Sequence, residues 1–234
     1  MNKPTSPHIY VIIPAFNEQS AVCNVLAEIP KDLVTEVIVV NNGSTDNTVE
    51  QALSCGATVL EEPNRGYGYA CLKGIDYLIQ KAVDASDIIV FIDADYSDYP
   101  SEMIKLIKPI QQNTADLVIG SRALGNKEKG SMTPQQVFGN WLATSLLKLF
   151  YNVEFSDLGP FRAIRFDKLL RIGMKDTTYG WTVEMQLKAA KIGLRCMEVP
   201  VNYRRRIGKS KVSGTIKGTI MAGYKILWTI FKYL

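Results

Sequence analysis

The chain has few of the residues from which many metal and catalytic sites are built. Its 234 residues include one histidine, His8, and four scattered cysteines, at positions 23, 55, 71 and 196, with no CxxC pair. Zinc sites and histidine-based triads need such residues close together, so the sequence disfavours both. We expect the cysteines to be free, buried thiols in a reducing compartment.

A secretory signal and nucleic-acid-binding motifs are also missing. The first residues, MNKPTSPHIYVIIP, contain no apolar segment of signal length before the first predicted strand, so we expect a cytoplasmic protein. No RNP-like, helix-turn-helix or aromatic-interleaved basic motif occurs, so nucleic acid is not an expected partner.

The net charge of +4 conceals two parts of opposite sign. Through Phe161 there are 11 Lys and Arg against 19 Asp and Glu, and from Arg162 onward there are 16 against 4. An acidic first part followed by a basic tail indicates contact with an anionic surface or a polyanionic ligand. A basic face that is simply solvated is the alternative.

Apolar runs alternate with helical periodicity over the first 125 residues. Strands are predicted within residues 8–18, 35–48, 57–63, 87–95 and 115–122, and helices within 19–28, 46–55, 65–83 and 100–110. This alternation predicts βαβ crossovers, and therefore a mostly parallel, Rossmann-like sheet with helices on both faces. Later, helices are predicted at 134–151, 162–173 and 180–193, and a strand at 196–206.

The last 21 residues predict an amphipathic helix. In GTIKGTIMAGYKILWTIFKYL the only charged residues are Lys217, Lys225 and Lys232, which fall on one stripe of a helix. That pattern is typical of a helix lying in a membrane interface, although a core helix or a protein–protein contact would also fit. We therefore divide the chain into a domain of residues 1–214, with a lateral helix at 134–151, and a C-terminal helix at 215–234.

Polar residues follow four of the predicted strands, at 14–18, 41–46, 93–98 and 121–122. Ligands of open α/β sheets bind at the carboxyl ends of the strands, so these clusters should meet at one edge. Asp93 and Asp95, as D-x-D, could share a Mg²⁺ or Mn²⁺ ion. By itself, DAD could also be a capping turn with a solvated aspartate.

The order of these motifs resembles the inverting family 2 glycosyltransferases, which have the GT-A fold. The motifs are VIIPAFNE, VVNNGSTDNT, NRGYGYACLKGI, FIDADYSDYP and ADLVIGSR. The stretch from DLGPFRAIR to RRRIGKSKVSGT is similar to the branch that contains dolichyl- and polyprenyl-phosphate mannosyltransferases and glucosyltransferases. The resemblance covers about Tyr10 to Thr215.

The resemblance implies a site for a nucleotide-diphosphate sugar, a UDP- or GDP-hexose. The residues implied are Pro14, Ala15, Glu18, Asn42, Asp46, Gly68, Asp93, Arg206 and Lys209. Asn41 and Asn42 stand where the family pattern usually has two aspartates, so the identity of the base is open. Asp46 could instead cap its helix, and Gly66 and Gly68 could serve only the helix entrance.

The resemblance also implies the metal, acceptor and catalytic residues. Asp93 and Asp95 would bind Mg²⁺ or Mn²⁺, and Arg122 would hold an acceptor phosphate, with Trp181 and Lys211 beside the acceptor. Arg122 could instead form only a salt bridge, and Trp181 could be a packed core residue. Arg206 and Lys209 would belong to a basic lid. Asp98 could lie behind the metal ligands, although the start of the helix that follows it is the favoured role.

A general base is needed only if the acceptor is an alcohol, because a phosphate monoester is already ionised near neutral pH. Asp157 is the favoured candidate over Glu184, which could pair with Lys188. Asp95, Asp157 and Arg122 are thus the candidate catalytic residues.

The expected activity is transfer of a hexose to a polyprenyl or dolichyl phosphate with inversion, on the cytoplasmic face of a membrane. A hydroxyl acceptor, with Asp157 as base, and a non-catalytic nucleotide-binding or interaction module are the alternatives. Anchoring could involve the helices at 134–151 and 215–234, a homo-oligomer or a separate membrane partner.

Overall fold

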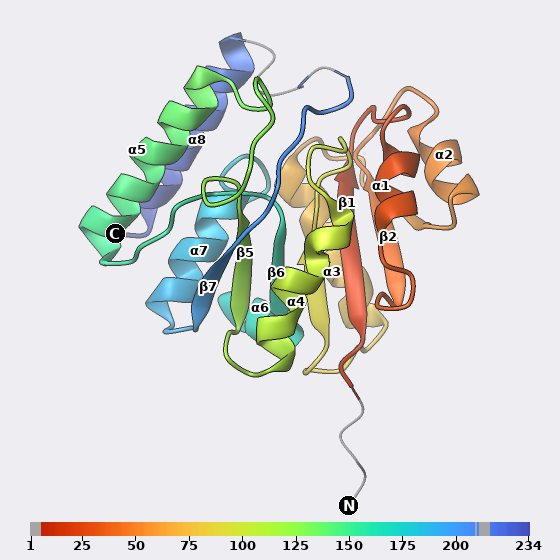
Figure 1. The fold of residues 1–234 in the computed structure, drawn as a ribbon, viewed down its shortest axis with the longest axis horizontal. Coiled ribbons are helices and arrows are strands. Elements are labelled where there is room, and N and C mark those ends of the chain that lie inside the picture. Colours follow the sequence, from red (N-terminus) through yellow and green to blue (C-terminus); the bar gives the residue numbers. More distant parts are fainter. Residues whose placement is uncertain (1–5, 209, 211–215) are drawn as a thin grey trace, which may run out of the picture.

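The computed structural model describes residues 6–208, 210 and 216–234 (Figure 1). Its strands are β1 (Ile9–Ala15), β2 (Glu36–Asn41), β3 (Thr58–Glu61), β4 (Ile88–Phe91), β5 (Leu117–Ser121), β6 (Arg162–Arg165) and β7 (Cys196–Pro200). They form one sheet in the order β3-β2-β1-β4-β6-β5-β7, in which only β6 runs antiparallel to its neighbours. The predicted α/β class with a mostly parallel sheet is confirmed.

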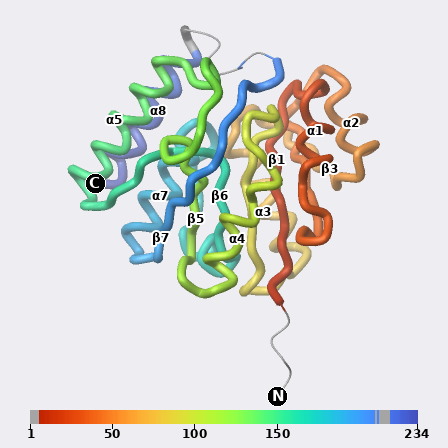
Figure 2. Tube along the Cα trace, viewed as in Figure 1, coloured from red at the N-terminus to blue at the C-terminus, as the bar shows by residue number. Residues whose placement is uncertain are grey.

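Helices cover both faces of the sheet, as the tube in Figure 2 also shows. They are α1 (Val22–Glu28), α2 (Thr48–Ser54), α3 (Tyr67–Gln80), the 3-10 turn η1 (Pro100–Glu102), α4 (Met103–Gln111), α5 (Pro134–Tyr151), α6 (Phe166–Ile172), α7 (Trp181–Lys191) and α8 (Ile216–Lys232). Side chains of β1 alternate between the two cores, because successive residues of a strand point to opposite faces. Val11 belongs to the core that contains residues of α1, α2 and α4, whereas Ile12 belongs to the core that contains residues of α3, α6 and α7.

The segment RAIRFDKLLRIG was predicted as one helix, and this is wrong for its first four residues. Arg162–Arg165 form β6, which pairs with both β4 and β5, and the helix begins only at Phe166. Four residues are too few for periodicity to distinguish a strand from a helix. The segment forms a strand because it can pair with both β4 and β5.

The expectation of four free thiols is also wrong in part. Cys23 and Cys55 form a disulfide, with their Cα atoms 5.8 Å apart across 32 residues of sequence. Cys71 and Cys196 are free, and Cys71 is buried. The disulfide joins the start of α1 to the end of α2, and these helices meet only because both cover the same face of the sheet.

Helices α5 and α8 pack side by side at one edge of the molecule and, with α7, enclose a small core of their own (Figure 1). The hydroxyl of Tyr233 donates to Glu184 at 2.6 Å, and that of Tyr151 donates to the carbonyl of Ile230 at 2.5 Å. The C-terminal helix therefore packs on the domain. Of the helices within the described residues, none has the length and apolarity that crossing a membrane requires.

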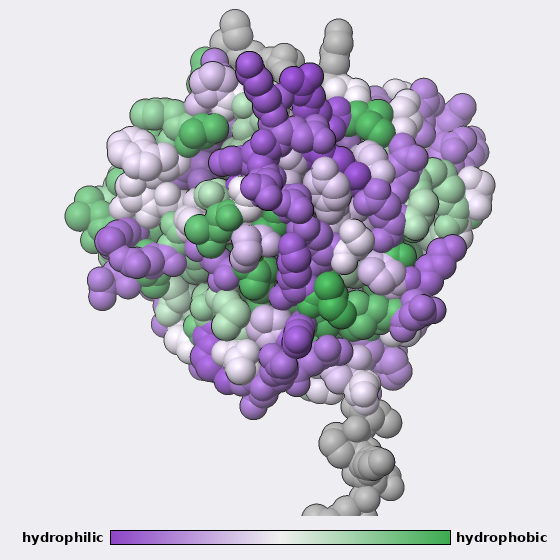
Figure 3. Space-filling view, viewed as in Figure 1, coloured by the Kyte–Doolittle hydropathy of each residue, from purple (hydrophilic) through white to green (hydrophobic). Residues whose placement is uncertain are grey.

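The exposed side of this helix pair is apolar, which differs from the predicted lysine stripe. Lys225 faces inward, where its Nζ lies 3.1 Å from Asp176 Oδ2. Of the seventeen exposed large hydrophobic side chains in the described chain, eleven belong to this pair and the residues that end it: Val137, Phe138, Trp141, Leu149, Phe150, Ile220, Met221, Tyr224, Trp228, Phe231 and Leu234. In Figure 3 hydrophobic side chains lie along the α5 edge, beside a hydrophilic band over the middle of the molecule.

Candidate active site

The carboxyl ends of β1, β2, β4 and β5 meet at one edge of the sheet and carry the predicted polar clusters. Because β6 is antiparallel, its first residue lies at this same edge, and so does the loop before it. Asp157 in that loop is thereby placed next to Arg122 at the end of β5. The sheet thus gathers residues from five separate segments, as ligand sites of open α/β sheets require.

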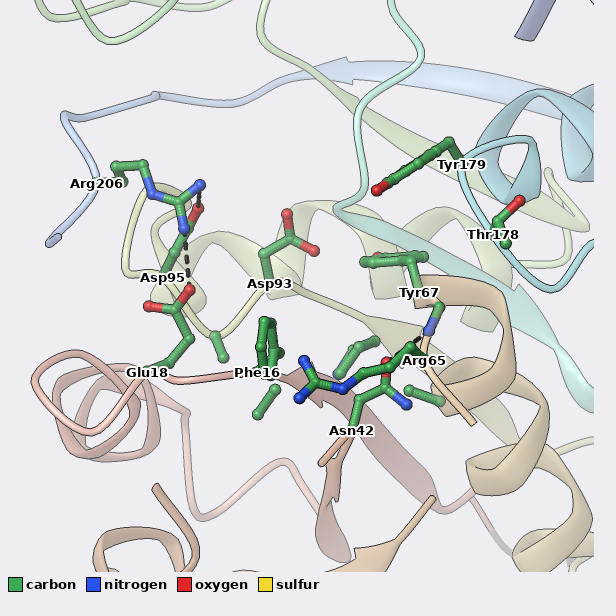
Figure 4. A pocket seen from close by; sticks show the side chains of 15 residues that line it. Phe16, Glu18, Asn42, Arg65, Tyr67, Asp93, Asp95, Thr178, Tyr179 and Arg206 are labelled. Atoms are coloured by element: carbon green, nitrogen blue, oxygen red, sulfur yellow. Dashed lines mark hydrogen bonds and ion pairs between the residues drawn. The ribbon is translucent and has the colours of Figure 1, made fainter. Parts of the chain in front are cut away.

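A first cavity, of about 360 Å³, opens at this edge (Figure 4). Its lining includes Pro14, Ala15, Glu18 and Asn42, which were predicted to bind the nucleotide-sugar, together with Asp93, Asp95 and Arg206. Residues from β1, β2, β4 and the segment after β7 therefore surround one space, as the sequence predicted.

Two predicted nucleotide-site residues are absent from the lining of this cavity. The carboxylate of Asp46 accepts hydrogen bonds from Gln19 N and Thr48 N, so it joins the start of α2 to the turn before α1. At Gly68 a Cβ atom would lie 2.0 Å from the carbonyl oxygen of Asp176. The glycine is needed there for close packing of α3 against that loop, which differs from the predicted contact with nucleotide.

Asp93 and Asp95 lie at the centre of the edge. Asp95 Oδ1 accepts hydrogen bonds from the Ser97 backbone N, at 2.9 Å, and from the Ser97 hydroxyl, at 2.5 Å. Asp93 Oδ1 is buried and has no hydrogen-bond partner among the described residues. Burial and the neighbouring Asp95 carboxylate raise the pKa of Asp93, as expected for two crowded like charges.

These two carboxylates fit a divalent cation. Mg²⁺ and Mn²⁺ prefer oxygen ligands, and a cation would offset the repulsion between the carboxylates and satisfy the buried oxygen of Asp93. The other cluster of potential metal ligands in the described chain is His8, Asp84 and Asp87, at the opposite end of β4. In that cluster the Asp87 carboxylate accepts hydrogen bonds from the backbone N–H groups of His8 and Asp84, so it stabilises a turn.

Arg206 lines the first cavity beside the paired carboxylates. Its Nη1 is 3.0 Å from Asp95 Oδ2, and its Nη2 is 2.9 Å from Glu18 Oε1. The segment after β7 thus places a cation directly beside the paired carboxylates. Lys209 and Lys211, predicted to act with it, lie outside the described residues.

A second cavity, of about 330 Å³, continues from the first. Six residues line both: Tyr67, Asp93, Asp95, Thr178, Tyr179 and Arg206. Beyond them the second cavity passes Arg122 and Trp181 and reaches Gly139 of α5 and Ile226 of α8. It therefore leads from the carboxylates to the apolar helix pair.

Arg122 and Asp157 form a two-pronged ion pair in the wall of the second cavity. Arg122 Nε and Nη2 lie 2.8 and 2.7 Å from the two oxygens of Asp157, and the Arg122 backbone N also donates to it. Although burial opposes its ionisation, the Arg122 guanidinium lowers the pKa of Asp157, which is 1% exposed. This arrangement orients Arg122 and leaves Asp157 poorly placed to accept another proton.

Asp98 differs from what the sequence suggested, whereas Glu184 forms the ion pair that the sequence suggested. Asp98 was expected to start a helix, but Tyr99 precedes η1, and Asp98 is buried with neither carboxylate oxygen hydrogen-bonded to a described residue. Glu184 is fully buried and binds Lys188 as proposed, at 2.7 Å, as well as two backbone N–H groups. Its role is to hold the loop before α7, so it is not exposed to a substrate.

Several lining residues were missed by the sequence reading. They are Phe16, Arg65, Tyr67, Thr178 and Tyr179. Phe16 lies in the motif PAFNE and Arg65 lies in the motif NRGYGY. An aromatic or cationic side chain in a predicted nucleotide-binding loop was the signal that could have identified them. Thr178 and Tyr179 belong to a loop before α7 that carries no such motif.

Arg162 was missed as well, because it was read as part of a helix. It is fully buried and donates hydrogen bonds to the carbonyl oxygens of Leu158, Gly159 and Thr182. Burial lowers its pKa to about 10. It joins the loop that carries Asp157 to the first turn of α7.

Comparison with known proteins agrees with this geometry. Residues 10–173 match the model of the family described as glycosyl transferase family 2. An uncharacterized glycosyltransferase of Mycobacterium tuberculosis is 34% identical over 216 residues, covering 92% of this chain and 94% of its own. An undecaprenyl-phosphate mannosyltransferase of Micrococcus luteus is 30% identical, covering 90% and 89%, and a dolichyl-phosphate hexose transferase of Haloferax volcanii is 31% identical, covering 91% and 90%.

Among solved structures, the chain is similar to glucosyl-3-phosphoglycerate synthase of Mycobacterium tuberculosis in complex with Mn²⁺, UDP and phosphoglyceric acid. The TM-score is 0.76 at 22% identity, and the match covers 97% of this chain and 78% of that chain. At this identity the similarity establishes the fold alone, which is the GT-A fold.

Proposed function

This chain belongs to glycosyl transferase family 2 and is a glycosyltransferase, and we propose that it transfers a hexose from a nucleotide-diphosphate sugar to a polyprenyl phosphate. The observation that carries the proposal is the continuity of the two cavities. The first cavity, which contains the paired carboxylates, opens into one that passes an arginine and ends between two apolar helices. A polyprenyl phosphate matches this order, because its anionic end would lie at the arginine and its long apolar chain would extend toward the helices.

The two cavities divide the substrates. The nucleotide-diphosphate sugar would occupy the first cavity, with its diphosphate near Asp93, Asp95 and Arg206. A Mg²⁺ or Mn²⁺ ion held by Asp93 and Asp95 would supply positive charge to the diphosphate as it leaves. The six residues that line both cavities would surround the sugar, because both substrates must meet there.

Arg122 would hold the phosphate of the acceptor. An arginine whose fork is fixed by Asp157 is already oriented, so little conformational entropy is lost when it binds the phosphate. A phosphate oxygen would then attack the anomeric carbon opposite the departing nucleoside diphosphate. The bond from that carbon to the diphosphate oxygen breaks, and the configuration inverts.

The state of Asp157 favours a phosphate over a hydroxyl acceptor. A hydroxyl must lose a proton to a base, whereas a phosphate monoester, with a second pKa near 6, is already ionised at neutral pH. Asp157 is engaged by three donors of Arg122. Charge stabilisation and positioning would therefore supply most of the catalysis.

The apolar helix pair would lie on a membrane surface, where the acceptor is found. Trp141 of α5 and Trp228 of α8 are 60% and 52% exposed, and aromatic side chains are enriched at membrane interfaces. A third cavity, lined by Phe138, Leu142 and Leu227 among others, lies between these helices and shares Gly139 and Ile226 with the second. We place the protein peripherally on the cytoplasmic face.

The test is mass spectrometry of lipids after incubation with undecaprenyl or dolichyl phosphate. Each lipid is paired with UDP-glucose, UDP-GlcNAc, UDP-galactose or GDP-mannose, with Mg²⁺ or Mn²⁺ and with EDTA. We expect a glycosyl-phosphate lipid that is absent with EDTA and in Asp95→Asn. Release of nucleoside diphosphate without this product would reject the lipid-phosphate acceptor while leaving the glycosyltransferase assignment in place.

A further inference from the structure

Asn42, at the end of β2, has an amide whose orientation is fixed by its neighbours. Its Nδ2 donates to the carbonyl oxygens of Glu62, at 3.1 Å, and Asn64, at 2.6 Å. Its Oδ1 accepts from the backbone N of Gly66 at 2.8 Å. Turning the amide over would place its oxygen against two carbonyl oxygens and its nitrogen against an N–H, so only one orientation satisfies these partners.

This orientation determines what Asn42 can offer a ligand. Both of its N–H groups are used within the protein, whereas its carbonyl oxygen retains a second lone pair. Asn42 lines the first cavity, and in Figure 4 its oxygen lies on the cavity side and its nitrogen points away. The side chain therefore presents one hydrogen-bond acceptor and no donor.

The nucleobases differ in the number of acceptors that they need. The Watson–Crick edge of uracil has a single N–H, at N3, between two carbonyl oxygens. That of guanine has the N1–H and the exocyclic amino group side by side, so it needs two adjacent acceptors. A carboxylate can provide both, whereas the one free lone pair of Asn42 can satisfy only one.

Resting on the function proposed above, we propose that Asn42 selects uracil over guanine, so that the sugar donor is a UDP-sugar. Guanine in this cavity would have a buried donor without a partner, and such a group lowers affinity by roughly tenfold or more.

Arg65 and Phe16 complete a site of suitable chemistry without determining the choice of base. The guanidinium carbon of Arg65 lies 3.9 Å from the centre of the Phe16 ring, and both residues line the first cavity. An aromatic ring can stack on any base, and a guanidinium can donate to a carbonyl oxygen of either uracil or guanine. Discrimination therefore depends on Asn42.

The experiment measures binding of UDP, GDP and N3-methyl-UDP to the whole chain by calorimetry in the presence of Mg²⁺. We expect UDP to bind roughly tenfold or more tightly than GDP. N3-methyl-UDP, which lacks the one donor that Asn42 would accept, should be weakened by a similar factor. This comparison needs no substitution and therefore does not depend on how a variant folds.

Asn42→Ala and Asn41→Ala form a matched pair of variants. Ala at position 42 removes the acceptor, so the ratio of UDP to N3-methyl-UDP affinity should fall to within roughly threefold. Asn41 undergoes the same chemical change but does not line the cavity, since its amide binds Glu61 and Ser44. Its variant should keep the ratio of the unsubstituted protein.

The outcomes separate this inference from the proposed function. GDP binding as tight as UDP binding, or undiminished binding of N3-methyl-UDP, would overturn the role of Asn42 and leave the glycosyltransferase in place. Failure to bind either nucleotide would overturn both. An unchanged ratio of UDP to N3-methyl-UDP affinity in a folded Asn42→Ala variant would also overturn the selection by Asn42.

Discussion

Arg206 Nη1 lies 3.0 Å from Asp95 Oδ2, so a cation of the chain itself is paired with a carboxylate that we assign to the metal. The same guanidinium reaches Glu18, 188 residues earlier in the sequence. A metal ion that enters the first cavity would compete with Arg206 for Asp95. A diphosphate that enters it would compete with the carboxylates for Arg206. Arg206 is therefore expected to affect metal and nucleotide binding in opposite directions.

We predict that Arg206→Gln binds Mn²⁺ about fivefold more tightly in the absence of nucleotide, because a neighbouring positive charge is removed. Binding of the nucleoside diphosphate should weaken about tenfold, because a charge-assisted hydrogen bond is lost. Electron paramagnetic resonance of free Mn²⁺ and calorimetry measure the two effects. Arg205→Gln is the control, since Arg205 is exposed and donates to the carbonyl of Lys129. If both affinities change in the same direction, the competition is rejected.

For the Arg122–Asp157 pair, we predict that Arg122→Lys and Asp157→Asn each lower kcat/KM for a lipid phosphate by about tenfold to a hundredfold. Lysine cannot form the two-pronged contact, and without the carboxylate the arginine is no longer oriented. The double variant should be little worse than either single one, because both changes disrupt the same contact.

The pH profile distinguishes this positioning role from general-base catalysis. If Asp157 only orients Arg122, the acidic limb of the kcat profile should have the same midpoint in Asp157→Asn as in the unsubstituted protein. Loss of that limb in Asp157→Asn alone would instead identify Asp157 as the base and favour a hydroxyl acceptor.

The apolar face of α5 and α8 should bind anionic lipid vesicles. We predict that Trp141→Glu and Trp228→Glu each reduce co-sedimentation with such vesicles on the order of tenfold, because apolar contact area is replaced by a charge. Leu53→Glu is the matched control, since Leu53 is 56% exposed but lies on α2. Equal loss in all three variants would show that the helix pair is not the membrane-binding face.

Asp116 should make stability depend on pH in the acidic range. Hydrogen bonds from Arg195, together with its charge, lower the pKa of Asp116 to about 2. The ionised carboxylate is thus favoured in the folded state. Its contribution to the free energy of unfolding is complete above the pKa of the unfolded state, near 4, and is lost as pH falls through about 2.

Because Arg195 is half exposed, we expect Asp116→Asn to lower the free energy of unfolding by only about 1 kcal/mol at pH 7. The difference between variant and unsubstituted protein should narrow between about pH 4 and pH 2, as urea denaturation at each pH would measure. A difference that is constant down to pH 2 would exclude ionisation of Asp116 as its origin.

The sequence by itself determined the class of the fold and the edge at which the site lies. Runs such as IIVFI favour strands that are buried on both faces, and polar residues that directly follow parallel strands should meet at one edge. These properties depend on local periodicity and on chain direction, so the placement of Asp93, Asp95 and Arg122 at one edge was predicted without coordinates.

Tertiary structure decided what depends on contacts between distant residues. The antiparallel insertion of β6 brings Asp157 to Arg122, 35 residues away. The carbonyl groups of Glu62 and Asn64 turn Asn42 from a residue with both donors and acceptors into one acceptor. Packing on α7 turns Lys225 inward and leaves an apolar face outside. None of these is encoded in a local pattern, because each depends on which distant group occupies the neighbouring space.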